Sequence, residues 1–229
     1  MTQKMFNHIT ENLLGYEDLE CNTGKTGRKY LTPDGKSFPS VTTVLSILSE
    51  DAIREWRHRV GEKEANRISH HASTRGTAVH AVIEDYINNK EDYLKDRMPL
   101  VVSNFNSVKS LLDESIGDVY CQEVPLYSEH LGLAGRVDCI AEFNGKLSVI
   151  DFKTSAKPKK KEYITNYFIQ ESAYAIMWEE RTGIPITQLV TIIAVDQHEP
   201  QVFIEHRDNW TDDLLSTIKE YNRRKLFGH

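Results

Sequence analysis

Two aspartates lie at equal distances on either side of an Asn-Gly pair, and this symmetry limits the possible folds more than any other feature of the sequence. Asn144-Gly145 is the strongest short signal for a two-residue hairpin loop, and the residues on both sides read as strands. If the register runs without a bulge, Asp138 faces Asp151. Directly opposed side chains lie roughly 5 Å apart, where two carboxylates repel by about 3 kcal/mol at an effective dielectric constant of about 20.

This carboxylate pair predicts a site for a divalent cation, because a cation between the oxygens turns the repulsion into ligation. Lys153 shares the face of Asp151, since side chains alternate along a strand. The strand from Leu147 to Lys153 is apolar on both faces, which indicates a central position where an unpaired lysine is costly. We expect Lys153 to hold the attacking water or the scissile phosphate of a metal-dependent phosphodiesterase.

The wider pattern predicts an α/β protein with a mixed central sheet flanked by helices, in one domain. Residues 1–39 are expected to be irregular and basic, residues 40–115 helical, and residues 116–229 a catalytic core of strands and helices. Ser40 is expected to cap a short helix, and a longer helical stretch should reach Asn89 with a break near Gly61. Strands are expected at 119–127, 133–143, 146–152, 188–194 and 201–206, and further helices at 100–114, 166–181 and 211–224.

The composition is that of a globular protein, with 39% hydrophobic and 27% charged residues. A net charge of -6 argues against a surface that coats DNA generally, but it permits a locally basic cleft. The three cysteines are widely spaced and indicate neither a disulfide framework nor a zinc motif. We find no apolar run long enough for a membrane span or a signal peptide, and we expect an intracellular, cytoplasmic protein of a bacterial or phage-infected cell.

Gly76, His80 and Glu84 recur every four residues and share one face of a predicted helix. The histidine and glutamate could form an ordinary i,i+4 pair. Alternatively, His80 supplies a nitrogen ligand to the cation, with Gly76 allowing a close backbone approach. Imidazole suits Mn²⁺ better than Mg²⁺, which prefers oxygen. Beside the aspartate hairpin, the ligand role is favoured.

Two segments have the composition of a nucleic-acid contact. Residues 54–75 interleave arginines with Trp56, which is either a core anchor or a platform on which a base stacks. The run Lys157-Pro-Lys-Lys-Lys161 is either a solvated loop or a phosphate contact, and it directly follows the candidate catalytic lysine. The i,i+4 spacing of Gln170 and Tyr174 is by itself typical of packing.

Four motifs coincide in order with a known pattern: Gly76-x3-His80-x3-Glu84, Gly135-Arg-Val-Asp138, Asp151-Phe-Lys153 and Gln170-x3-Tyr174. The chain resembles the RecB-like branch of the PD-(D/E)XK nucleases, and within that branch the group of mitochondrial genome maintenance exonucleases and their small phage and bacterial relatives. The likeness starts at Pro39-Ser-Val-Thr42 and runs to about Tyr174. It implies a restriction-endonuclease-like fold with a helical segment over the cleft.

The resemblance also implies roles for single residues. His80, Asp138, Asp151 and the carbonyl of Phe152 would hold Mg²⁺ or Mn²⁺, Lys153 would position or activate water, and Glu84 would support the site. Contacts to DNA are expected from Ser40, Thr42, Trp56, Arg57, Arg75, Lys157, Lys159, Gln170 and Tyr174. Some members of the group use four cysteines for an iron–sulfur cluster; three cysteines cannot supply such a set, so no cluster is expected.

We therefore predict a metal-dependent DNA exonuclease that prefers single-stranded DNA with a free end. The helices before the sheet would close a passage that admits one strand but not a duplex. A structure-specific flap endonuclease is the alternative within enzymes. A non-catalytic nucleic-acid-binding module on the same scaffold and a metal phosphatase for small molecules are the others, although the phosphatase would leave the basic run unexplained.

Overall fold

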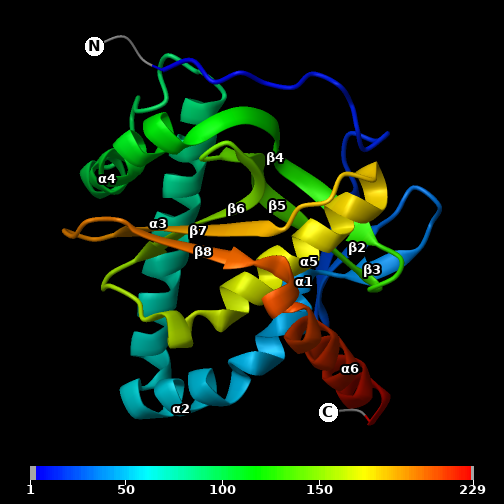
Figure 1. Cartoon of the computed structure of the whole chain (residues 1–229). Coiled ribbons are helices and arrows are strands. Elements are labelled where there is room, and N and C mark those ends of the chain that lie inside the picture. Colours follow the sequence, from blue (N-terminus) through cyan, green and yellow to red (C-terminus); the bar gives the residue numbers. More distant parts are fainter. Residues whose placement is uncertain (1–3, 228–229) are drawn as a thin grey trace.

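The computed structural model describes residues 4–227 and contains a large and a small β-sheet (Figure 1). The large sheet has five strands in the order β4-β5-β6-β7-β8. Its strands are β4 (Ile116–Ser128), β5 (Leu133–Phe143), β6 (Lys146–Ser155), β7 (Gln188–Val195) and β8 (Gln201–His206). All neighbours are antiparallel except β6 and β7, which are parallel. The predicted mixed sheet is confirmed, and β6 with Asp151 and Lys153 is its middle strand.

The helices are α1 (Val41–Leu45), α2 (Glu50–Val60), α3 (Glu62–Ile87), α4 (Pro99–Ser115), α5 (Thr165–Thr182) and α6 (Thr211–Phe227). Short 3-10 turns cover residues 46–48, 161–163 and 207–209. The predicted break at Gly61 is confirmed, because its φ of +84° lies in a region that glycine adopts without strain. None of the helices within residues 4–227 has the length and apolar composition needed to cross a membrane.

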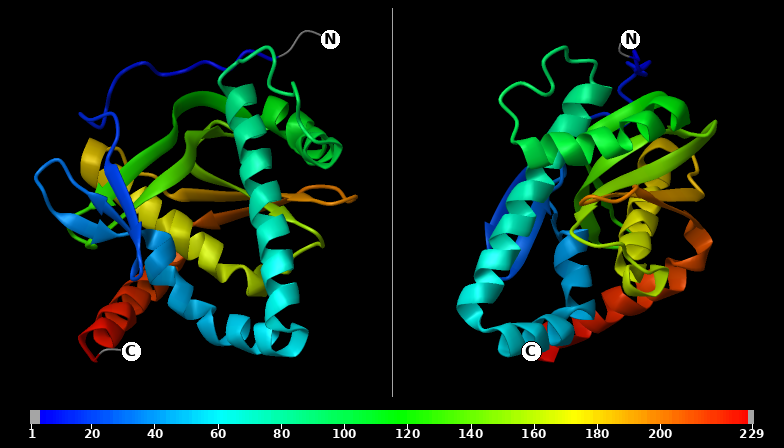
Figure 2. Two further views of the ribbon diagram at one scale, coloured as in Figure 1. Left: turned by 180° about the vertical axis from the view of Figure 1, so that it is seen from behind. Right: turned by 90° about the vertical axis from the view of Figure 1, so that its left-hand side faces the viewer.

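The two faces of the large sheet carry separate hydrophobic cores, because neighbouring residues of a strand point to opposite sides. Ile150 of β6 packs with Val79 and Phe105, from α3 and α4. Val149, the preceding residue, packs with Met177 of α5 and with residues of α1 and α6. Seen from behind, α3 runs the length of the molecule across the sheet, with α2 turning away at its lower end (Figure 2). One part of α3 therefore lies against the sheet, and another part is exposed to solvent.

The expectation that residues 1–39 are irregular is wrong for part of this segment. Strands β1 (Glu20–Gly24), β2 (Gly27–Leu31) and β3 (Ser37–Pro39) form the small antiparallel sheet. β1 is exposed along its whole length, so it lacks the alternation of apolar and polar residues that predicts a strand. The sheet is held instead by Tyr30, which is buried with Tyr127 and Ala134 of the large sheet.

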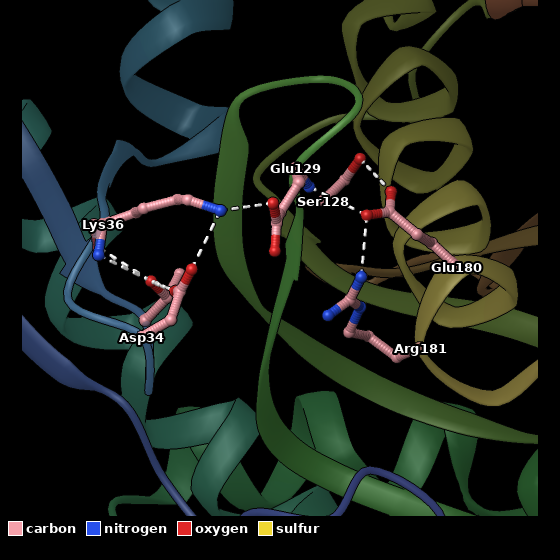
Figure 3. A network of polar contacts seen from close by, with 7 residues as sticks. Asp34, Lys36, Ser128, Glu129, Glu180 and Arg181 are labelled. Atoms are coloured by element: carbon pink, nitrogen blue, oxygen red, sulfur yellow. Dashed lines mark hydrogen bonds and ion pairs between the residues drawn. The ribbon is translucent and has the colours of Figure 1, made fainter.

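A polar network fastens the small sheet to the core (Figure 3). Lys36 pairs with Asp34 and with Glu129, which lies in the turn between β4 and β5. The backbone N–H of Glu129 donates to Glu180 on α5 at 2.9 Å, and the Ser128 hydroxyl donates to the same carboxylate. Arg181 completes the network with an ion pair to Glu180 at 2.8 Å. The end of α5 is thereby tied to the turn that begins β5.

Candidate active site

The hairpin has the predicted turn and register. Asn144 and Gly145 have φ values of +52° and +76°, the positive values that a type I′ turn requires. Pairing runs without a shift from Phe143–Lys146 to Cys139–Ile150, so Asp138 and Asp151 are the next residues in register. The ladder stops there because the Asp138 carboxylate accepts a 2.9 Å hydrogen bond from the Phe152 N–H. The predicted juxtaposition of the two aspartates is confirmed.

Asp151 is held by two side chains on its own face of the sheet. Its Oδ2 forms an ion pair with Lys153, and its Oδ1 accepts a 3.1 Å hydrogen bond from the amide of Gln170 on α5. Burial raises the pKa of Asp151 to about 6, with Lys153 opposing and Asp138 adding to the shift. Oδ2 is buried, and its partner is the Lys153 ammonium, so a cation at this oxygen would share it with the lysine.

Lys153 lies between the carboxylates and an aromatic ring. Burial by itself would lower the pKa of Lys153, but the charges of Asp151 and Asp138 raise it above its ordinary value. The ammonium also lies 5.1 Å from the centre of the Tyr167 ring. Lys153 is therefore a fixed positive charge next to the aspartate pair.

His80 reaches the hairpin from α3. Its Nδ1 lies 3.5 Å from Oδ2 of Asp138, and its ring stands edge-on to Phe152 with centroids 6.4 Å apart. The expected reason for Gly76 is wrong, because a Cβ there would meet Thr154 at 3.6 Å, an ordinary contact. The helix brings His80 to the aspartates without requiring a glycine one turn earlier.

Glu123 on β4 is a candidate metal ligand that the sequence analysis missed. The pairs Gln122–Cys139 and Val124–Val137 place it opposite Asp138, so three carboxylates follow one line across β4, β5 and β6. One ligand atom each of His80, Glu123 and Asp138 lie within 4.8 Å of one another. Burial, with the charges of Asp138 and Glu84 adding to the shift, raises the pKa of Glu123 to about 7.

The donor set fits a divalent cation: one imidazole nitrogen and carboxylate oxygens held close together, with a further buried carboxylate alongside. Glu123 has a φ of +49°, which is rare for a residue with a side chain and is found where function requires it. The signal in the sequence was an acidic residue inside a strand expected next to the hairpin. The predicted set of His80, Asp138, Asp151 and Phe152 is thus joined by Glu123.

Tyr174 explains the glycine of the Gly135-Arg-Val-Asp138 motif. A Cβ on Gly135 would lie 2.8 Å from the Tyr174 ring, closer than real Cβ atoms come to other atoms. The ring is 2% exposed, and burial raises the pKa of its hydroxyl well above its ordinary value, with the aspartate charges adding to the shift. Tyr174 in this conformation packs against β5 behind the site, while Gln170, one turn earlier, reaches Asp151.

Glu171 is a second buried carboxyl that the sequence analysis missed. It follows Gln170 on α5 and accepts a hydrogen bond from the Thr191 hydroxyl on β7. Burial raises the pKa of Glu171 well above its ordinary value, and the nearby Asp151 charge adds to this. A neutral Glu171 avoids a further negative charge beneath the aspartate pair.

The residues expected to contact DNA lie in several environments. The hydroxyl of Ser40 caps α1 by accepting from the Thr43 N–H at 3.0 Å, and Thr42 beside it is exposed. Arg57 pairs with Glu62, and Arg75 pairs with Asp196 at 2.5 Å. Trp56 is half-buried. Lys157 and Lys159 are exposed and have no ion-pair partner within residues 4–227, so both charges are open to a phosphate.

The fold and these side chains define a class of protein. The family described as the PD-(D/E)XK nuclease superfamily matches residues 50–226, and the chain belongs to this superfamily; it is a nuclease. The chain is similar to mitochondrial genome maintenance exonuclease 1 of Xenopus tropicalis, with 32% identity over 210 residues, covering 82% of this chain and 58% of the relative.

The human and mouse proteins of that name are 32% and 30% identical over 131 residues, covering 53% and 54% of this chain. Each match covers 38% of the relative, so the chain spans between 38% and 58% of the length of these relatives. The resemblance inferred from the four motifs is confirmed.

Proposed function

We propose that this nuclease is a metal-dependent DNA exonuclease that acts on single strands with a free end. The observation that carries the proposal is the line of Glu123, Asp138 and Asp151 across three strands, with His80 beside it and Lys153 on the same face. A carboxylate line of this kind repels itself in the absence of a cation, and a fixed lysine next to it suits a phosphate substrate.

His80, Glu123, Asp138 and Asp151, with the carbonyl of Phe152, would hold the cation. When bound, a divalent cation supplies a water of lowered pKa and positive charge beside the scissile phosphate. Lys153 holds its ammonium next to that position and offsets negative charge that develops on the phosphate oxygens. Gln170 orients Asp151, and Asp151 in turn orients Lys153. The imidazole of His80 favours Mn²⁺ over Mg²⁺.

The preference for a free end rests on the exposure of α3. Residues 66–74 are exposed on every side of the helix, whereas Ala65 before them is fully buried. Arg75, just after them, is fixed by Asp196. A helix held at both ends with no core of its own forms a bridge, and Figure 2 shows this part of α3 standing apart from the sheet. In the proposed function, the single strand passes beneath this stretch of α3 and therefore enters by an end.

Digestion of matched substrates tests the proposal. Linear single-stranded DNA with a label at either end should be degraded with Mn²⁺, while a covalently closed circle of the same sequence and a blunt duplex should be spared. Lys153→Ala is the inactive control. Rapid cutting of the circle would favour the flap endonuclease. Binding without cleavage would indicate a non-catalytic module, and hydrolysis of a chromogenic phosphodiester but not of DNA would indicate a small-molecule phosphatase.

Trp56 provides a separate test of strand binding. If its half-buried ring stacks on a base, Trp56→Ala should weaken binding of single-stranded DNA by about 1–3 kcal/mol. Affinity should also fall as salt rises, because counterions return to the phosphates. Arg54→Ala is a matched control in the same helix, since Arg54 pairs with Asp51 on the surface. Equal effects of the two substitutions would argue against stacking.

A further inference from the structure

A pocket of about 470 Å³ lies between α3 and the start of α4, outside the metal site. Its walls are mainly apolar and include Ile68, Ala72 and Ala78 of α3, with Met98 and Leu100 at the start of α4. Met98 is 69% exposed, Leu100 46% and Ile68 39%. Large apolar side chains exposed together around one hollow are typical of a binding site.

The size and chemistry of the pocket suit a flat aromatic ring with an anion next to it. A pocket of about 470 Å³ is of the size that takes small ligands. His70 and His71 also line it and give a polar rim with donors, and Arg75 lies there with its charge paired to Asp196. An unpaired base has two apolar faces, polar edges and a phosphate attached, which matches both parts of this lining.

The pocket lies next to the metal site along α3. Its α3 residues end at Ala78, two residues before His80, and Ala72 is eight residues before His80, so it lies within about 80° of His80 around the helix. The exposed residues 66–74 contribute to the pocket and directly precede the part of α3 that carries His80. The pocket residue Ala156, just after β6, is three residues after Lys153, which is at most about 10 Å of extended chain.

We propose that this pocket receives one unpaired base of the DNA strand whose phosphate lies at Lys153. The inference rests on the proposed function, and it adds a base-holding site at the bridge, next to the metal site. A base held there fixes the strand within a few nucleotides of the cleaved bond. It also keeps the strand under the bridge between successive cuts.

An abasic scan tests the pocket. Single-stranded oligonucleotides that each lack one base, at successive positions from the labelled end, are titrated with the full chain in Ca²⁺ to measure Kd. One position, or two adjacent ones, should weaken binding about tenfold, while neighbouring positions change it less than twofold. This scan uses the unmodified protein and does not depend on any variant folding.

Two variants assign the effect to the pocket. Met98→Ser removes an apolar wall and places a favoured capping residue before α4, because Met98 is the N-cap of that helix. Met98→Ser should bind the intact oligonucleotide about tenfold more weakly than the unmodified protein does. Removing the base at the sensitive position should then weaken its binding no further. Ile204→Ser, at an apolar residue of β8 that is 49% exposed, is the matched control and should keep the position-specific loss.

A flat abasic profile would overturn the proposal, as would a position-specific loss that persists in Met98→Ser; either result would leave the pocket to another ligand, such as an apolar side chain of a partner. Failure of the proposed function looks different. In that case the unmodified protein cleaves no linear single-stranded DNA in Mn²⁺, whatever the abasic scan gives.

Discussion

Glu123→Gln should stabilise the metal-free protein at alkaline pH. Burial and the charges of Asp138 and Glu84 raise the pKa of Glu123 from 4.5 to about 7. A carboxyl whose folded pKa is raised holds its proton more tightly in the folded state. The contribution of Glu123 to the free energy of unfolding is therefore fully present below about pH 4.5 and is lost as the pH rises through 7.

The size of the effect follows from the shift. Each pKa unit corresponds to about 1.4 kcal/mol, so the full shift of Glu123 would cost about 3 kcal/mol of unfolding free energy at pH 8; because Glu123 is only partly buried, solvent screening reduces this to about 1–2 kcal/mol, and to under about 1 kcal/mol at pH 5. Glutamine keeps the shape and carries no charge. We expect Glu123→Gln to exceed the unmodified protein by about 1–2 kcal/mol at pH 8 in EDTA, with the gap closing toward pH 5.

Urea unfolding in EDTA at pH 5, 6, 7 and 8 measures this difference, provided that the m-values of the two proteins agree. Glu114→Gln, at an exposed position at the end of α4, is the matched control and should show no such gap. Excess Mn²⁺ should reverse the order, because the unmodified protein binds the cation more tightly and gains more stability from it. Parallel pH profiles of Glu123→Gln and the unmodified protein would refute the reasoning.

Three further predictions concern the same site. Asp138→Asn and Asp151→Asn should both abolish cleavage, but only Asp151→Asn should destabilise the metal-free protein, by about 1–3 kcal/mol in urea unfolding, because it leaves Lys153 buried without its partner; equal stability of the two variants would contradict this. His80→Ala should lose most activity, and the unmodified protein should cleave faster in Mn²⁺ than in equal Mg²⁺; a wild-type rate for His80→Ala in both metals would place this residue outside the site. Gly135→Ala should lower the free energy of unfolding by about 1–3 kcal/mol because its Cβ would strike the Tyr174 ring, whereas Gly76→Ala, inside α3 with only an ordinary contact to Thr154, should raise it by up to about 1 kcal/mol; similar melting temperatures for both would be inconsistent with this packing.

The hairpin was predictable because local rules fix it completely. A two-residue Asn-Gly loop admits one register, and alternation then places Lys153 on the face of Asp151. Glu123 could not be placed in the same way. The strand that carries it is joined to β5 through a longer turn, and a turn of this length does not fix the register as Asn-Gly does. In the structure the register runs unbroken from Ser128–Leu133 past Glu123 and shifts only beyond it, near Val119.

Contacts between distant segments also could not be predicted from the sequence. The packing of Tyr174 against Gly135 joins α5 to β5, and neither residue signals the other along the chain. The small sheet was not predicted because its strands are short, polar and exposed, and they are ordered by a few contacts such as those of Tyr30. Alternation along β6 predicts that Asp151 and Lys153 share a face. That they form an ion pair in the metal-free site depends on the burial of both groups, which the sequence does not reveal.

Under the proposed function, the bridge in α3 would make selectivity for ends a matter of local stability. Residues 66–74 include Asn66, Ser69, Ser73 and Thr74, which are poor helix formers, and no core holds them in place. Transient opening of this stretch, with the sheet intact, would let a closed circle slip in sideways. The proposed discrimination between linear and circular DNA would then be limited by the free energy of that opening, about tenfold for each 1.4 kcal/mol. Alanines in residues 66–74 would stabilise this helical stretch and increase the discrimination, and a glycine there would decrease it.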